Sequence, residues 1–138
     1  EKILPFVTEQ YACGSNIPVI MGGYSLAGLF ALWSACQTEM FSAVAAVSPS
    51  VWFPWWSDYV KEHKLRSEQI YLSLGRKEEK TRNKIMAAVG DCIRELHQRL
   101  MGAGITSVLE WNEGNHFQES DLRCAKGFVW CVRNIGHI

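Results

Sequence analysis

Long apolar runs are missing from this chain of 138 residues. None reaches the roughly 20 residues that a membrane-spanning helix needs, and the first residues, Glu1 to Pro5, lack the basic and then apolar order of a signal peptide. An excess of one charge is also missing, since 14 Lys and Arg balance 14 Asp and Glu. We therefore expect a chain without nucleic-acid or membrane partners.

The sequence also lacks any Cys-x-x-Cys pair. Its five cysteines are Cys13, Cys36, Cys92, Cys124 and Cys131. Most lie among apolar residues, where a reduced thiol packs as a small hydrophobic group, so we expect free thiols and a cytoplasmic location. No histidine or carboxylate completes a metal-binding set beside Cys124 and Cys131, and we predict no metal site.

A Pro-, Gly- or Ser-rich linker is likewise absent, so residues 1–138 are interpreted as a single domain. Short apolar runs rich in β-branched or aromatic residues predict strands at Val19–Met21, Val44–Val47, Ile70–Leu74 and Val108–Trp111. Helical patterns separate them. This alternation predicts an α/β fold with about four parallel strands flanked by helices on both faces.

Five helices are expected between and around these strands, at residues 1–12, 26–36, 57–66, 80–101 and 119–133. In the fourth, apolar residues recur every three or four positions at Ile85, Val89, Ile93, Leu96 and Leu100. The second carries no charge from Leu26 to Trp33, which predicts that protein covers it all round. The last is expected to pack through Leu122, Ala125, Val129 and Val132.

Ser25 lies between a strand and a helix, within Gly22-Gly23-Tyr24-Ser25-Leu26-Ala27-Gly28. This is the setting of a nucleophile elbow, in which the chain turns so sharply that the residues two before and two after the serine must be small. Gly23 and Ala27 meet that requirement. The turn also aims the Leu26 N–H at the site of a forming oxyanion. The alternative interpretation is a serine that caps a buried helix after a Gly-rich turn.

Two further polar groups follow the third and fourth strands: Glu78 with Glu79, and His116. Carboxyl ends of parallel strands meet at one edge of the sheet, where such folds bind ligands. An imidazole can take the proton of a serine hydroxyl, and a carboxylate can orient that imidazole. The order serine, acid, histidine is that of the α/β-hydrolases. We predict Ser25 and His116 as catalytic, with Glu78 preferred to Glu79 as the acid.

These motifs, together with Ser48-Pro49-Ser50-Val51-Trp52, Gly75-x-x-Glu78 and Gly114-x-His116, resemble the Putative esterase family of α/β-hydrolases. That family includes esterase D, enterochelin esterases and feruloyl esterases, and the chain is similar to its C-terminal half. The resemblance implies an acid three residues after one glycine and a histidine two after another, which match Glu78 and His116.

The resemblance further implies an enzyme without cofactor or metal, acting on a small-molecule ester. It implies substrate contacts at Tyr24 and Trp52. The aromatic run Val51–Trp56 follows the strand beside the elbow, which also favours a role in lining a pocket. Family members carry upstream strands and a loop with a second oxyanion-hole N–H that this sequence does not include.

We thus hypothesise a serine carboxylic-ester hydrolase with a Ser25–His116–Glu78 triad and the Leu26 N–H as oxyanion donor. The alternative is a catalytically impaired hydrolase fragment that acts only as an association module. In the α/β-hydrolase order that the resemblance implies, the four strands are consecutive neighbours, so the Val19–Met21 strand lies at an edge with unpaired backbone groups. We therefore predict self-association across that edge, most simply as a homodimer.

Overall fold

A computed structural model describes residues 2–11 and 17–135 of the chain. Four parallel strands form one sheet in the order β1-β2-β3-β4. Their bounds are Ile20–Tyr24 for β1, Ala43–Val47 for β2, Gln69–Gly75 for β3 and Thr106–Asn112 for β4. The predicted α/β fold and the predicted strand order are confirmed, with each strand one to three residues longer than expected.

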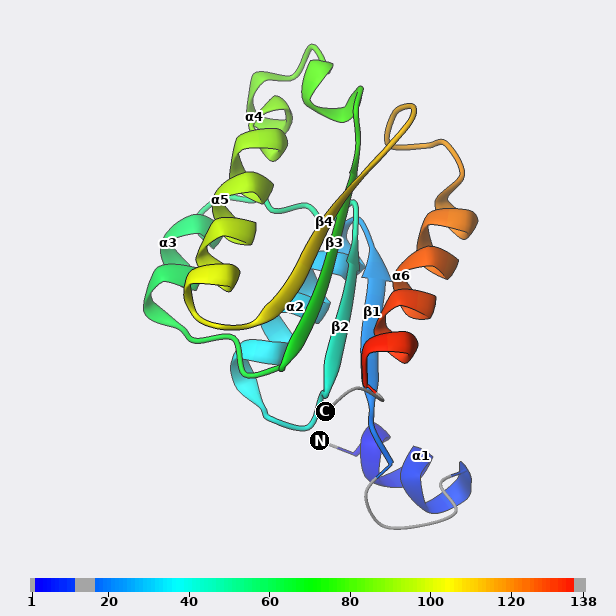
Figure 1. Cartoon of the computed structure of the whole chain (residues 1–138). Coiled ribbons are helices and arrows are strands. Elements are labelled where there is room, and N and C mark those ends of the chain that lie inside the picture. The colour runs from blue at the N-terminus through cyan, green and yellow to red at the C-terminus, as the bar shows by residue number, and fades with distance from the viewer. Residues whose placement is uncertain (1, 12–16, 136–138) are drawn as a thin grey trace.

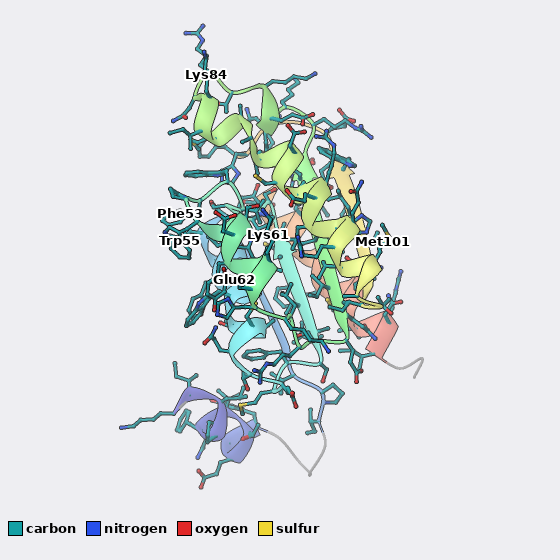
Figure 2. The ribbon with its side chains drawn as sticks, turned by 90° about the vertical axis from the view of Figure 1, so that its left-hand side faces the viewer. Phe53, Trp55, Lys61, Glu62, Lys84 and Met101 are labelled. Carbon is teal, nitrogen blue, oxygen red and sulfur yellow. The ribbon has the colours of Figure 1, made fainter. Side chains whose placement is uncertain are left out.

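Helices cover both faces of this sheet (Figure 1). One face carries α2 (Leu26–Gln37), α3 (Trp56–Glu62) and α5 (Val89–Gly102), and Figure 2 looks onto it, with Lys61 and Glu62 on α3 and Met101 at the end of α5. The other face carries α6 (Ser120–Ile135). Every residue of β2 and β3 is buried, as central parallel strands require. Because β3 and β4 are parallel, the loops that follow them lie at the same edge of the sheet, at the top of Figure 1.

The first helix, α1 (Ile3–Tyr11), matches the expected helix at residues 1–12 within the described part. None of its residues is buried, and it lies below the sheet in Figure 1. Cys13 and the two outermost residues of that expected helix, 1 and 12, lie outside the described residues. Cys36, Cys92, Cys124 and Cys131 are free, as expected. Burial raises the pKa of Cys36 and Cys131 to about 11, which suits thiols that pack rather than react.

The predicted helix at 80–101 is wrong in its first half. The structure has a 3-10 turn, η1 (Glu78–Lys80), then a short α4 (Lys84–Ala87), and α5 only from Val89. Asn83 accepts hydrogen bonds from the Ile85 and Met86 N–H groups, so it caps a new helix where the pattern predicted an interior. Ile85 is consequently exposed, while Val89, Ile93, Leu96 and Leu100 are buried as predicted.

The expectation that protein covers the helix after Ser25 all round is also wrong. Leu29 and Leu32 face the sheet, but Leu26, Phe30 and Trp33 on the opposite side of α2 are exposed. The absence of charge therefore marks an apolar outer surface as well as a buried one. Together with the aromatic segment at 53–56, this side of α2 forms an apolar groove of about 430 Å³. Figure 2 shows Phe53 and Trp55 at this border of the molecule.

The inner face of α6 differs from the predicted one. Leu122, Val129 and Val132 are exposed, as is Ala125. The helix instead packs through Arg123, Gly127 and Cys131, which recur every four residues. Gly127 allows this approach, because a Cβ there would lie 3.0 Å from the Tyr71 ring. The apolar stripe of the sequence thus lies on the outside of the helix.

Candidate active site

Ser25 occupies a strained turn between β1 and α2. Its φ of 59° and ψ of −121° are unusual for a residue with a side chain. A Cβ on Gly23 would lie 2.5–2.7 Å from the carbonyl carbon, carbonyl oxygen and Cβ of Ala27. This is the collision that the sequence predicted for larger residues at these positions. The Ser25 N–H donates to the Val47 carbonyl at 3.0 Å, which ties the turn to the end of β2.

The loop after β4 brings His116 to this turn. The Nε2 atom of His116 lies 2.9 Å from the Ser25 Oγ atom, and its Nδ1 atom lies 2.8 Å from Oε2 of Glu78. Glu79 points elsewhere, with its carboxylate 2.9 Å from the Arg94 guanidinium. Of the two acids left open by the sequence, Glu78 is the one beside the imidazole. Hydroxyl, imidazole and carboxylate therefore form one hydrogen-bonded chain.

Glu78 is buried, with 7% of the residue exposed, and both oxygens of its carboxylate accept hydrogen bonds. Its Oε1 atom accepts hydrogen bonds from the Gly75 N–H at 2.7 Å and the Ser48 hydroxyl at 2.8 Å. Burial acts to raise the pKa of this carboxyl. The hydrogen bonds from His116, Gly75 and Ser48 outweigh burial, so the net pKa lies below the ordinary value. Glu78 is thus held in the charged form that an adjacent imidazolium would need.

Close contact between two loops explains why glycine precedes the acid in Gly75-x-x-Glu78 and the histidine in Gly114-x-His116. A Cβ on Gly75 would lie 2.6 Å from the Gly114 carbonyl oxygen and 2.9 Å from Oε1 of Glu78. Gly114 has φ of 91°, a conformation that favours glycine, and its carbonyl accepts from the Lys77 N–H at 3.0 Å. The two loops therefore approach too closely for side chains at these positions, and this contact brings the acid beside His116.

Tyr24, expected to contact substrate, has a different position. Its hydroxyl donates to the His116 carbonyl oxygen at 2.7 Å, and its ring centroid lies 5.2 Å from that of the imidazole. It is not among the residues that line the cavity at Ser25. The geometry gives Tyr24 a place behind the histidine loop, and the expected substrate contact stays a prediction.

A cavity of about 280 Å³ opens at the Ser25 hydroxyl. Trp52 lines it, as expected, together with Phe117 and Met86. Phe53, Trp55 and Trp56 line the groove along α2 instead, so only part of the aromatic run faces the serine. In residues 2–11 and 17–135, no three His, Cys, Asp or Glu side chains could together hold a metal ion.

Leu26 begins α2, so its N–H has no acceptor one turn earlier in the helix. The N-terminal end of a helix also carries a partial positive charge. The Leu26 N–H is therefore free of a helical acceptor and lies at the positive end of α2, as an oxyanion donor should. The Leu26 side chain itself is 59% exposed.

Sequence reasoning missed three polar side chains at the site. The Ser50 hydroxyl lies 3.3 Å from the Ser25 Oγ atom, Ser48 holds Glu78, and Arg123 reaches the same carboxylate from α6. The two serines follow β2 at the edge where Ser25 lies, which is a signal the sequence carries. For Arg123 the available signal is its spacing: it lies four residues before Gly127 and eight before Cys131, two small residues on the buried face of α6.

The sequence matches the family model described as "Putative esterase" over residues 1–120. No curated protein sequence matches the chain. No helix in the described ranges is both long and apolar enough to cross a membrane.

Several solved structures resemble the chain. The enterobactin esterase FES from Shigella flexneri, in the presence of 2,3-di-hydroxy-N-benzoyl-serine, has a TM-score of 0.75 and 20% identity, covering 99% of this chain and 37% of that one. The IroE-like serine hydrolase from Shewanella oneidensis has a TM-score of 0.70 and 18% identity, covering 91% of this chain and 42% of that one. The siderophore hydrolase EstA from Aspergillus nidulans has a TM-score of 0.63 and 18% identity, covering 96% of this chain and 55% of that one.

At these identities the likeness shows a shared fold. This chain spans between 37% and 55% of the length of the three structures.

Proposed function

This chain belongs to the Putative esterase family, and on that premise we propose that it is a serine carboxylic-ester hydrolase acting through an acyl-enzyme. One observation carries the proposal: Ser25, His116 and Glu78 are joined by contacts of 2.9 and 2.8 Å at the mouth of a cavity. A serine hydroxyl is a weak nucleophile at neutral pH, and such a chain is what activates it.

In the first half-reaction, the Ser25 Oγ atom forms a bond to the ester carbonyl carbon while His116 Nε2 takes the hydroxyl proton. The Leu26 N–H donates to the oxyanion that develops. The carbon–oxygen bond to the leaving alcohol then breaks, and His116 returns the proton to that alcohol. Glu78 accepts the hydrogen bond from His116 Nδ1 throughout, so it fixes the tautomer and offsets the imidazolium charge.

In the second half-reaction, water attacks the acyl-enzyme while His116 takes one of its protons. The bond between the acyl carbon and Ser25 Oγ breaks, and the proton passes to Ser25. The products are a carboxylic acid and an alcohol, and every group of the enzyme returns to its starting state. No cofactor is needed for these steps.

The substrate class we propose is a small ester with an aryl or acyl group that packs against Trp52 and Phe117. Two of the similar structures are named for enterobactin or siderophore hydrolysis, and one was solved with a dihydroxybenzoyl compound. These names support including an aryl ester among the substrates tested.

The proposal is tested with p-nitrophenyl acetate and a p-nitrophenyl benzoate, comparing wild type with Ser25→Ala. We expect Ser25→Ala to lose nearly all turnover and to keep its circular dichroism spectrum and melting temperature, because the hydroxyl contributes chemistry and little packing. A Ser25→Ala variant as active as wild type would exclude Ser25 as nucleophile. No turnover in wild type would favour the alternative, an association module.

We also propose that two copies of the chain pair across β1. In the described residues β1 pairs only with β2, so the backbone groups on its other side have no strand partner. A twofold contact would satisfy these groups in both copies at once.

We further propose a cytoplasmic location. The four described cysteines are free thiols, which is the state that a reducing compartment maintains.

A further inference from the structure

Arg123 on α6 is a buried cation that the proposed reaction does not use. Its side chain is 1% exposed, although its neighbours Leu122, Ala125 and Lys126 lie at the surface. Removing a guanidinium from water costs several kcal/mol unless charged and polar partners replace the water. The contacts that offset this cost therefore indicate what the residue does.

The guanidinium donates four hydrogen bonds, and each acceptor belongs to a residue close to His116 or to its loop. Its Nη1 atom donates to Glu78 Oε1 at 3.1 Å, to the Tyr24 hydroxyl oxygen at 3.2 Å and to the Ser48 hydroxyl oxygen at 3.4 Å. Its Nη2 atom donates to the Glu113 carbonyl oxygen at 2.7 Å. One planar group thus joins α6 to the loops after β2, β3 and β4 and to the end of β1.

These partners hold His116 from three directions. Glu78 uses its other oxygen to accept from His116 Nδ1. Tyr24, which accepts from Arg123, donates to the His116 carbonyl. The carbonyl of Glu113 lies in the same loop, three residues before the histidine. The Glu78 carboxylate and the backbone carbonyls of Glu113 and His116 are therefore all held, directly or through Tyr24, by the Arg123 side chain.

We propose that Arg123 is a positioning residue: its guanidinium fork sets the Glu78 carboxylate and the 113–116 loop at the separation that proton transfer between Ser25 and His116 needs. The inference rests on the proposed function and adds a residue that acts through others and touches no reacting atom. It depends on the fork, because Nη1 and Nη2 serve different loops. A lysine supplies the charge from one atom and cannot hold both.

The test compares wild type with Arg123→Lys and Arg123→Met. We expect Arg123→Lys to fold and to lower kcat about 10- to 100-fold, since small displacements of reacting groups cost this much, with KM changed less than about two-fold. Arg123→Met should lower kcat at least as far. In proton NMR, the low-field signal of the His116 Nδ1 proton should be present in wild type and weakened or lost in both variants.

The matched control is Arg94→Lys, which alters another Arg–Glu pair close to the site, on the surface. It should keep the kcat and the low-field signal of wild type. A folded Arg123→Lys with wild-type kcat and a wild-type low-field signal would overturn the proposal, because charge alone would then suffice. If Arg123→Met does not fold, Arg123→Lys decides.

Failure of this inference can be told apart from failure of the proposed function. Ser25→Ala reports on the reaction alone, whereas the low-field proton reports on the Glu78–His116 contact in a folded chain whether or not it turns over ester. An inactive wild type whose signal survives Arg123→Lys would contradict the positioning role directly. An inactive wild type whose signal is lost in Arg123→Lys would support the role and reject only the hydrolase.

Discussion

At the scale of single residues, Glu78 shows how one carboxylate serves two purposes. Its Oε2 atom faces His116, while Oε1 is shared among the Gly75 N–H, the Ser48 hydroxyl and Arg123. The contacts to Oε1 stabilise the ionised form that the contact to His116 uses. A buried acid without them would sooner take up a proton, because burial raises its pKa.

This arrangement predicts a pH dependence of stability. Because the pKa of Glu78 is lowered on folding, its contribution to the free energy of unfolding is complete above the ordinary glutamate pKa and is lost as the pH falls through the folded pKa. We expect the stability difference between wild type and Glu78→Gln to be largest at about pH 7 and to shrink below about pH 4. Urea unfolding across this range measures it.

Glu79→Gln is the matched control for that experiment. Glu79 pairs with Arg94 near the surface, where ion pairs contribute little. The stability of Glu79→Gln should therefore follow that of wild type over the whole range. A difference between wild type and Glu78→Gln that stays constant with pH would contradict the account given for Glu78.

At the scale of elements, α6 is the helix that contacts the acid and the histidine loop of the site from behind, through Arg123. It packs against β1, β2 and β3 through Arg123, Gly127 and Cys131, one residue per turn. Gly127 lies where the helix approaches Tyr71 and Val47, so its position sets the distance from α6 to the sheet. That distance in turn determines where the Arg123 guanidinium can reach.

We therefore expect Gly127→Leu to destabilise the fold by about 1–3 kcal/mol, the usual cost of overpacking, and to lower esterase turnover more than a loss of folded protein explains. Ala125→Leu adds the same side chain two residues earlier on the exposed face and should leave stability within about 0.5 kcal/mol. Thermal and urea unfolding provide the comparison. Equal effects of the two substitutions would show that the inner face of α6 is assigned wrongly.

At the scale of the whole molecule, both edges of the sheet are only partly covered. All five residues of β1 are half-buried, and in β4 only Asn112 is buried. Beyond β1 the exposed side chains of α2 and of Trp55, which is 62% exposed, add apolar surface. Surface of this kind is uncommon on a stable monomer and usually marks a contact.

The proposed pairing across β1 predicts a solution mass near twice the 15.6 kDa of the chain. Ile17→Lys, at an exposed position just before β1, should shift the equilibrium toward the monomer, because charge at an edge opposes strand pairing. Ile3→Lys on α1 serves as control and should keep the wild-type mass. Light scattering coupled to size exclusion gives the result, and a monomer at every concentration would reject the dimer.

The sequence by itself determined the features that depend on neighbours along the chain. Apolar runs and turn residues sufficed for the four strands, and the resemblance to α/β-hydrolases implied their order. The spacings Gly75-x-x-Glu78 and Gly114-x-His116 carried the candidate site, because each glycine closes a strand just before the side chain that the turn presents. The small residues around Ser25 reflect a collision within one turn, which local sequence also records.

Tertiary structure alone decided which face each helix presents and what covers it. A repeat of three to four residues shows that α6 has a stripe, but Leu122 and Val132 lie outside while Arg123 lies inside. Periodicity leaves the rotation of a helix open when a glycine allows close packing and a buried carboxylate offers a partner for a cation. The roles inferred for Arg123 and Tyr24 depend on contacts between separate segments of the chain, including the one between these two residues, so local sequence could not supply the roles.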